Sequence, residues 1–276
     1  MQERTRKILK TGLITIAAIA GIVVLGTVAY AVNNATQTVK YDYDHFNARQ
    51  YNFKRFDGPK VGEAAVDFTA TDLNGKTVRL SDYFGKTVVL ETGSITCPMF
   101  VDRMQGMREL VAEFPDVVFL IQYVREAHPG SGFPQPKTNA QKLEHARQVV
   151  AQDGETRTIL VDDVSGAGHK AYGSWPNSAY VIDGTGVVAY RQQWVNPPVM
   201  REALKRLAAN QSVADLEAKV IKAGPEVMSR VLWRAGPEAV MDFTVNGPTV
   251  VVRHALEDKK MAKELHDEAA DKEKKI

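Results

Sequence analysis

The 276-residue sequence predicts a three-layer α/β sandwich, preceded by an apolar segment and followed by a small α/β or helical extension. Three observations lead to this fold class. Between residues 61 and 210, short apolar runs bounded by turn residues alternate with stretches of helical spacing, as in strands joined by helices. Residues 11–32 carry no charge. Two Gly-Pro pairs and a charged tail set residues 211–276 apart from what precedes them.

Composition excludes several classes of protein. The chain is 44% hydrophobic, which is enough for a full core, and its single cysteine excludes a disulfide scaffold. Its 35 basic and 33 acidic side chains give a formal net charge of +2. No broad basic field follows from that charge, so we expect no nucleic-acid partner.

Residues 11–32 are predicted to cross a membrane once. As a helix, 22 residues without a charge are long enough for a hydrocarbon core of roughly 30 Å. Four bases against one acid in residues 1–10 place that end in the cytoplasm and the soluble part outside it. The alternative to an uncleaved anchor is a removed signal peptide, because Ala29-Tyr30-Ala31 has the form of a cleavage site.

The soluble part is predicted to begin with a linker and a hairpin. Residues 33–60 are polar but rich in aromatics, which suggests a tether that packs partly on the domain. Residues 66–69 and 77–80 alternate between apolar and polar, with Asn74-Gly75 as a strong turn signal between them.

The remaining elements of the domain at 61–210 run strand, helix, strand, helix, strand, strand, helix. Strands are predicted at 87–92, 117–124, 158–161, 178–182 and 186–191, and helices at 98–113, 139–152 and 198–209. Residues 125–138 form a Pro/Gly-rich loop. The first two strands are expected to be parallel and joined by the first helix.

The extension at 211–276 contains a strand-like run from Thr249 to Val252. Its tail, from Glu257 to Lys275, mixes acids and bases and is predicted to be a helix with a solvated charged face.

Cys97 is the first candidate for chemistry. It follows a buried strand and opens a helix, where backbone N–H groups and the helix dipole favour an anion, so we predict a lowered thiol pKa and a nucleophilic sulfur. Ser94 and Thr96 could donate hydrogen bonds to a thiolate, and Pro98 suits a first helical turn. The alternative is a small buried apolar residue.

The surroundings of Cys97 contain no C-x-x-C motif. Ser94 lies three residues before it and Phe100 three residues after it. An oxidised Cys97 must therefore be reduced by an external thiol or redox protein, and no cofactor is predicted.

The segment from Val61 to Leu207 resembles the thioredoxin-like superfamily. Within it, GSITCPMF at 93–100 and FLIQYVREAHP at 119–129 are similar to the iodothyronine deiodinase family, as are AYG at 171–173 and YVI at 180–182. In that family the position of Cys97 is usually selenocysteine, which takes iodine during its reductive removal from a phenol ring. The resemblance implies that Glu126 and His128 serve in substrate contact and proton delivery.

The predicted positions of Glu126 and His128 in the fold are compatible with this role. Both follow the second strand, whose carboxyl end lies at the same sheet edge as Cys97. An imidazole that titrates near neutrality can pass a proton to a leaving carbon or oxygen. The alternative is a surface histidine in a Pro-rich loop. Tyr123 is expected to pack rather than react.

Trp175 and Pro176 are predicted to shape the site. Thioredoxin-like proteins carry a cis proline before the corresponding strand, so the resemblance implies a cis Pro176. The other histidines show no ligand-like spacing, and we expect no metal; they are His45, His145, His169, His254 and His266.

The chain also departs from the deiodinase pattern. Phe133 stands where the family often has tryptophan, residues 191–194 replace an expected glycine pair, and residues 137–141 lack a further histidine. These departures argue against a thyroid-hormone substrate, whereas a thiol-dependent redox role is still predicted.

The leading prediction is a membrane-anchored, single-cysteine oxidoreductase of the cell membrane that resembles deiodinases. Its substrate would be a small molecule, with a halogenated aromatic as the candidate, and a homodimer stays open. One alternative is a one-cysteine peroxidase, in which Cys97 becomes a sulfenic acid. Another is a binding or assembly module that uses residues 211–276 as its interaction surface.

Overall fold

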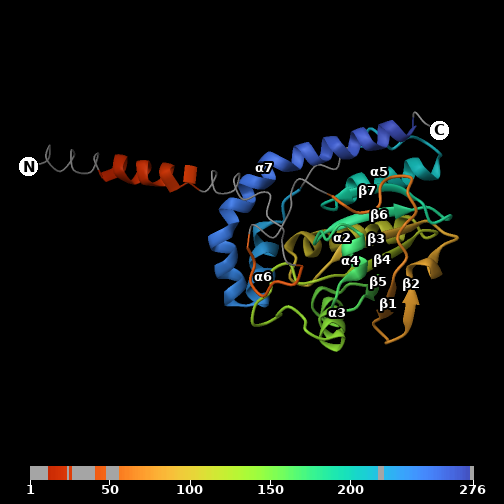
Figure 1. Cartoon of the computed structure of the whole chain (residues 1–276), viewed down its shortest axis with the longest axis horizontal. Coiled ribbons are helices and arrows are strands. Elements are labelled where there is room, and N and C mark those ends of the chain that lie inside the picture. The colour runs from red at the N-terminus through yellow and green to blue at the C-terminus, as the bar shows by residue number, and fades with distance from the viewer. Residues whose placement is uncertain (1–11, 24, 27–40, 48–55, 217–220, 274–276) are drawn as a thin grey trace, which may run out of the picture.

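The computed structural model describes residues 12–23, 25–26, 41–47, 56–216 and 221–273 (Figure 1). Seven strands form one mixed sheet in the order β2-β1-β5-β4-β3-β6-β7. The central strands β3, β4 and β5 are parallel, whereas β1, β2, β6 and β7 run antiparallel to their neighbours. The strands are β1 (Thr69–Asp72), β2 (Thr77–Arg79), β3 (Val88–Gly93), β4 (Val118–Tyr123), β5 (Thr158–Val161), β6 (Ser178–Ile182) and β7 (Val188–Gln193).

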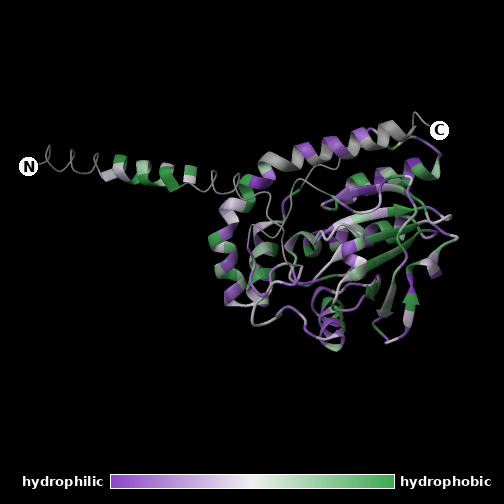
Figure 2. Cartoon of the chain, viewed as in Figure 1, coloured by the Kyte–Doolittle hydropathy of each residue, from purple (hydrophilic) through white to green (hydrophobic). Residues whose placement is uncertain are grey.

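Helices and loops cover both faces of this sheet. The helices α2 (Pro98–Glu113), α3 (Asn139–Asp153) and α5 (Pro197–Ala208) pack on one face, where Ile121 and Val181 are buried. The opposite face carries Leu90, Leu120 and Tyr180 under the short helices η2 (Leu80–Tyr83) and α4 (Ala167–Ala171). The central strands are largely hydrophobic (Figure 2), as strands buried on both faces must be. The predicted α/β layering with a hairpin before it is confirmed.

Most of the predicted elements of the domain match closely, but two strands are shifted and two short helices, η2 and α4, were not predicted. The bounds of α2, β5 and β6 are those predicted, those of α3, α5, β3 and β4 differ by one residue at one end or both, and β7 lies two residues later than predicted. The hairpin turn is at Asn74-Gly75, where Asp72 accepts backbone hydrogen bonds from Asn74 at 2.9 Å and Lys76 at 2.8 Å. Its first strand begins at Thr69 rather than Val66.

The register of β3 and β4 determines where the site lies. The two strands pair in parallel from Val88 opposite Val118 to Gly93 opposite Tyr123, so they end side by side. The loop that carries Cys97 and the loop that carries Glu126 and His128 therefore leave the sheet at the same edge, as predicted.

The extension is helical and packs on the domain. Its helices are α6 (Pro225–Ala235) and α7 (Pro237–Glu273), which meet at Gly236 (φ 127°). The predicted strand Thr249–Val252 is wrong, because that run lies within α7. The β-branched residues of this run favour a strand, but packing outweighs that preference. The inner face of the helix is buried, as Ala239 and Arg253 show. The predicted helical tail is confirmed as far as Glu273.

The predicted membrane segment, residues 11–32, lies partly outside the described residues. Residues 12–23 and 25–26 are helical, and their aliphatic side chains are exposed, with Ile14 at 69%. Considering only the described ranges, no helix combines the length and the apolar character needed to cross a membrane.

Candidate active site

Cys97 lies in the turn that joins β3 to α2. Its backbone N–H donates to the Ser94 carbonyl at 3.0 Å, and its own carbonyl accepts from Val101 N–H at 3.1 Å, which makes Cys97 the N-cap of the helix. Pro98 occupies the first helical position, where its missing N–H costs nothing. Gly93 is required here, since a Cβ would lie 2.2 Å from the ring of Phe100.

The environment of the sulfur raises the pKa of the Cys97 thiol. Burial raises it to about 12, and the backbone N–H groups of Phe100 and Met99 offset this only in part. The predicted lowering is therefore wrong. The side chain is only 2% exposed, so the loss of hydration outweighs the stabilisation that the helix N-terminus gives a thiolate. In this structure Cys97 is a neutral thiol at neutral pH.

Glu126 is fully buried at the centre of a polar network. Its carboxylate accepts hydrogen bonds from the Thr96 hydroxyl at 2.6 Å, the Tyr123 hydroxyl at 2.5 Å and His145 Nδ1 at 3.0 Å. Burial, followed by the charge of Glu126, raises the pKa of Tyr123 well above its usual range. Tyr123 therefore packs and donates, as expected, and does not titrate.

Sequence reasoning missed His145. Its position in α3, beside the buried Ala146 and Val149, brings it to the end of β4, where it bonds to Glu126. The only signal in the sequence was a polar residue on the buried face of a predicted helix.

Ser94 and Thr96 hold the second loop rather than the sulfur. The Ser94 hydroxyl accepts from the Ala127 N–H at 3.3 Å, and the Thr96 hydroxyl accepts from the His128 N–H at 3.3 Å. Because Thr96 also donates to Glu126, the loop that carries Cys97 and the loop that carries His128 are joined by one set of hydrogen bonds.

His128 is the candidate for proton transfer in this second loop. Its ring packs against Phe46, with centroids 4.3 Å apart, and against Phe243 at 5.5 Å. Burial lowers the pKa of His128 to about 3, so the ring is neutral at pH 7. Its Nδ1 is buried without a hydrogen-bond partner among the described residues. A buried polar atom left in this way is costly to the fold and points to a ligand.

Pro176 faces the site, but its peptide bond is trans. No cis peptide bond occurs in the described part of the chain, so the predicted cis Pro176 is wrong. The preceding carbonyl, that of Trp175, accepts from His169 Nε2 at 2.5 Å and from the Thr92 hydroxyl at 3.1 Å.

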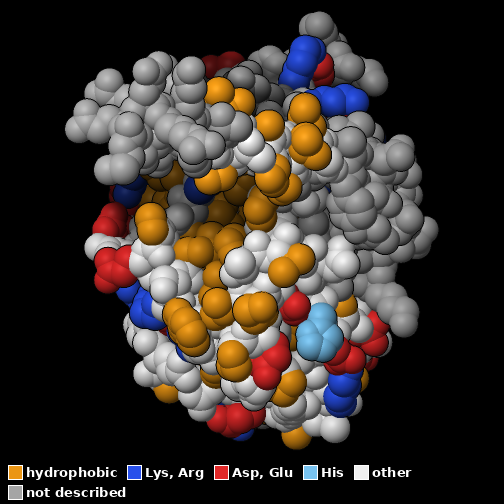
Figure 3. Space-filling model, turned by 90° about the vertical axis from the view of Figure 1, so that its left-hand side faces the viewer, with side chains coloured by type: hydrophobic (Ala, Val, Ile, Leu, Met, Phe, Trp, Pro, Cys, Tyr) orange, Lys and Arg blue, Asp and Glu red, His pale blue; other side chains and the backbone are white. Residues whose placement is uncertain are grey.

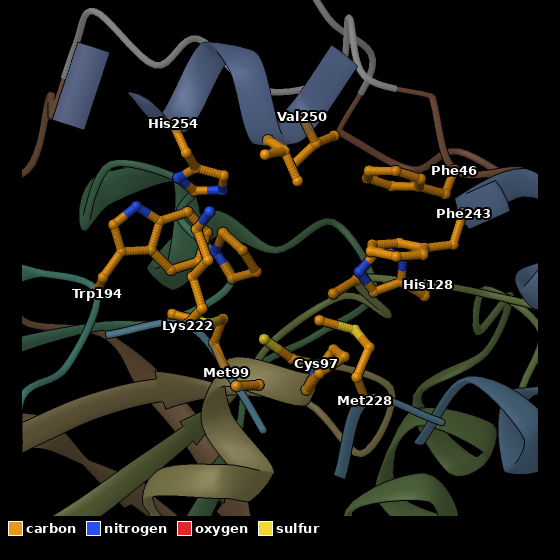
Figure 4. Close-up of a pocket in the computed structure, with 15 residues that line it drawn as sticks. Phe46, Cys97, Met99, His128, Trp194, Lys222, Met228, Phe243, Val250 and His254 are labelled. Carbon is orange, nitrogen blue, oxygen red and sulfur yellow. The ribbon is translucent and has the colours of Figure 1, made fainter. Parts of the chain in front are cut away.

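A cavity of about 160 Å³ lies against the sulfur. Of the predicted site residues, Cys97, Pro98, His128 and Pro176 line it, whereas Glu126, Ser94, Thr96, Tyr123 and Trp175 lie behind them. Figure 4 shows Cys97, Met99 and Met228 on one side and Val250 and His254 on the opposite side, with Trp194 and His128 at the two ends. The lining is largely apolar.

Several of the lining residues come from outside the predicted domain. Met228 lies on α6, and Phe243, Val250 and His254 lie on α7. Phe46 comes from the predicted linker, where Tyr43 also donates to the Ala127 carbonyl at 2.9 Å. No cluster of three or more metal-binding side chains occurs among the described residues.

Comparison with known proteins identifies the family. The family model described as "Iodothyronine deiodinase" matches residues 26–197. The chain belongs to the iodothyronine deiodinase family. Its α/β fold, with one mixed sheet between layers of helices, agrees with the layered α/β architecture that the sequence predicted.

Curated deiodinase relatives match the same region. Thyroxine 5-deiodinase of Gallus gallus is 32% identical over 140 residues, which cover 46% of this chain and 54% of the relative. The enzyme of the same name from Rattus norvegicus is 33% identical over 125 residues, covering 41% and 40%. This deiodinase-family chain therefore matches about half the length of these relatives or less.

Solved structures are more distant from the deiodinase-family chain. A putative thiol:disulfide interchange protein DsbE from Chlorobium tepidum is 20% identical with a TM-score of 0.44, covering 55% of this chain and 98% of its own. A hypothetical protein from Sinorhizobium meliloti is 16% identical with a TM-score of 0.48, covering 61% and 93%.

Proposed function

We propose that the protein is a thiol-dependent reductive dehalogenase of halogenated phenols, with Cys97 as the nucleophile. The observation that carries this proposal is that Cys97 and His128 line one largely apolar cavity, in a chain of the deiodinase family. An apolar cavity with a few polar groups suits an aromatic ring with one polar substituent.

The first step moves the halogen from carbon to sulfur. A proton adds to the ring carbon that bears the halogen at the same time as the sulfur of Cys97 takes the halogen without its bonding electrons. The new C–H bond is made from a π electron pair of the ring, and the pair left by the carbon–halogen bond replaces it and restores the aromatic system. Carbon is reduced and sulfur is oxidised, so the phenol loses its halogen and Cys97 becomes a sulfenyl halide.

Two equivalents of an external thiol complete the cycle. The first attacks the sulfenyl halide, releases halide and a proton, and forms a mixed disulfide with Cys97. The second attacks this mixed disulfide, restores the Cys97 thiol and leaves as the oxidised disulfide. An external reductant is required because the chain has no second cysteine.

The protonation states of the site fit this reaction without an outside acid. The first step consumes one proton, and the neutral Cys97 thiol carries one. Burial raises the pKa of the Cys97 thiol and lowers that of His128, so a full transfer of the proton from the sulfur to the imidazole is strongly unfavourable in the resting site. We therefore propose that His128 relays the proton only as the sulfur–halogen bond forms, when the thiol becomes a stronger acid.

Glu126 acts in this scheme as a positioning residue. It is held by Thr96, Tyr123 and His145, away from the cavity, and so fixes the loop that presents His128. Its contribution is the geometry between His128 and Cys97.

The decisive experiment measures halide release. Full-length protein in mild detergent is incubated with an iodinated phenol and excess dithiol, beside the Cys97→Ser variant. We expect iodide from the wild type and none above buffer from the variant. Equal release from both would refute the proposal. Rapid, stoichiometric sulfenate formation with peroxide, without iodide release, would favour the peroxidase alternative.

We also infer that residues 11–32 hold the protein in a membrane. The aliphatic side chains of the helical part are exposed, with Leu13 at 65% and Ile19 at 57%, and such a surface calls for a lipid cover. In the test, the wild type and Ile19→Val should sediment with membranes after an alkaline wash. Ile19→Lys should be released in part, because a central lysine costs about 2.5–3.5 kcal/mol on insertion. The mass of the mature protein distinguishes anchoring from cleavage.

A further inference from the structure

The cavity at Cys97 has a roof that lies beyond the deiodinase match. The family model ends at residue 197, whereas Lys222, Met228, Phe243, Val250 and His254 all line the cavity. Figure 3 views the side of the molecule on which α6 and the start of α7 lie, and shows apolar side chains gathered around a hollow. We use the word roof for residues 225–254, which comprise α6 and the first half of α7 and include the lining residues Met228, Phe243, Val250 and His254.

The roof is fixed to the loops of the site. The Ala235 carbonyl, at the end of α6, accepts from Gly132 N–H at 2.9 Å, and Arg234 donates to the Ile95 carbonyl at 2.7 Å. A Cβ on Gly130 would lie 2.4 Å from the same Ala235 carbonyl oxygen, so the loop after His128 and the roof touch through backbone. The roof is therefore part of the cavity wall.

The N-terminal side of the cavity is tied to the same roof. Phe46 N–H donates to the Asp242 carboxylate at 3.2 Å, and the Asn246 side-chain amide donates to the Phe46 carbonyl at 3.3 Å. Phe46 and Phe243 then flank the ring of His128 (Figure 4). These two aromatic rings line the cavity at its His128 end.

The volume of this cavity matches that of one aromatic ring. A dry apolar cavity of about 150 Å³ is known to take a single benzene, and this cavity measures about 160 Å³. Two polar groups in the lining are buried without a hydrogen-bond partner among the described residues, Nδ1 of His128 and Nε1 of Trp194. Lys222, which forms no ion pair within the described ranges, adds a cation at the wall.

We propose that the roof restricts this site to single-ring halogenated phenols and excludes two-ring diphenyl ethers, with Phe243 and Val250 as the residues that set the limit. This inference rests on the proposed function and names its substrate class. The hydroxyl of such a phenol meets the polar groups of the wall, and the halogen-bearing carbon lies between Cys97 and His128.

The experiment compares iodide release from iodophenol with release from iodinated 4-phenoxyphenol, using full-length protein and excess dithiol. For the wild type we expect kcat/KM to favour the single ring by about tenfold or more, because a second ring overfills the cavity. Val250→Ala and Phe243→Ala should each raise kcat/KM for the two-ring compound about fivefold. Val245→Ala, on the same helix but 70% exposed and outside the lining, should leave both substrates unchanged.

Two outcomes separate this inference from the proposed function. Equal or faster turnover of the two-ring compound by the wild type would overturn the size limit and leave the dehalogenase intact. If no protein releases iodide, the proposed function fails, and binding of phenol and 4-phenoxyphenol to Cys97→Ser, followed by tryptophan fluorescence, decides the size limit. Binding of phenol alone, with 4-phenoxyphenol admitted by Val250→Ala, supports it, and equal binding of both by Cys97→Ser alone overturns it.

Discussion

The two sides of Cys97 differ in how completely their polar groups are paired. Behind the sulfur, the buried Glu126 carboxylate accepts three side-chain hydrogen bonds, and Ser94 and Thr96 bind the neighbouring loop. In front of it, the cavity is largely apolar and leaves His128 Nδ1 unpaired among the described residues. The hydrogen-bonded network behind the sulfur stabilises the two loops, whereas the cavity in front of it is available to a ligand.

The largest effect should come from His128. Replacing it with leucine removes the proton relay, so kcat for halide release should fall by about 10²–10⁴-fold. Because the lost imidazole nitrogen was unpaired, the free energy of unfolding should stay within about 1 kcal/mol of wild type. Steady-state iodide assays and urea titrations measure the two quantities. Activity within about threefold of wild type would exclude His128 as the relay.

The thiol of Cys97 should be unusually unreactive at neutral pH. With a pKa of about 12 against an ordinary value near 8.5, its thiolate fraction at pH 7.5 is about three-thousandfold lower, and alkylation by iodoacetamide should be slowed accordingly. Since the pKa is raised, the rate should keep climbing about tenfold per pH unit between pH 8 and 11.

The urea-unfolded protein is the control for this measurement, and its alkylation rate should level off above about pH 9. Burial alone would slow alkylation equally at every pH, so the slope and not the rate is the test. A native profile that levels off below about pH 7 would show a thiolate and contradict the raised pKa.

Removing Glu126 should affect the fold more than the chemistry. Glu126→Ala leaves the hydroxyls of Thr96 and Tyr123 and the His145 imidazole without their acceptor, which should lower the free energy of unfolding by about 3–5 kcal/mol. The matched control is Glu144→Ala on α3, an exposed carboxylate whose loss should cost no more than about 0.5 kcal/mol. Equal stabilities of the two variants in urea titrations would contradict the network.

The smallest effect should come from Lys222. Lys222→Met should raise KM for a phenolate about two- to fivefold and leave kcat unchanged, because an exposed ion pair contributes only about 0.2–1 kcal/mol. Lys86→Met, which lies outside the cavity lining, should change neither constant. An unchanged KM for Lys222→Met would remove this lysine from substrate recognition.

The sheet, and the loops that meet at its edge, could be predicted from the sequence better than the cavity. Strands such as β5 and β6 are apolar runs with clear turn residues at their ends, and parallel pairing then places Cys97, Glu126 and His128 at one edge. These relations are local or follow from topology. The role of His145 was not predicted, because its contact with Glu126 depends on the exact register of α3.

The roof and the protonation states could not be derived in the same way. The run Thr249–Val252 favours a strand by propensity, and only its packing within α7 decides otherwise. The pKa of Cys97 was predicted to fall because of the helix N-terminus, but burial of the sulfur raises it, and the core cluster that contains Cys97 includes Val231 of α6. Both are tertiary effects, since they arise from segments more than a hundred residues apart.

The most direct test of the account is a single turnover without external thiol. Reduced full-length protein is mixed with excess iodophenol, and the amounts of dehalogenated phenol and of remaining thiol per chain are measured. The Cys97→Ser variant is the control. The account predicts one dehalogenated phenol per chain, the loss of the Cys97 thiol, its recovery on adding dithiol, and no product from the serine variant. Product from the serine variant, or none from folded wild type with a titratable thiol, would contradict the assignment of Cys97 as halogen acceptor.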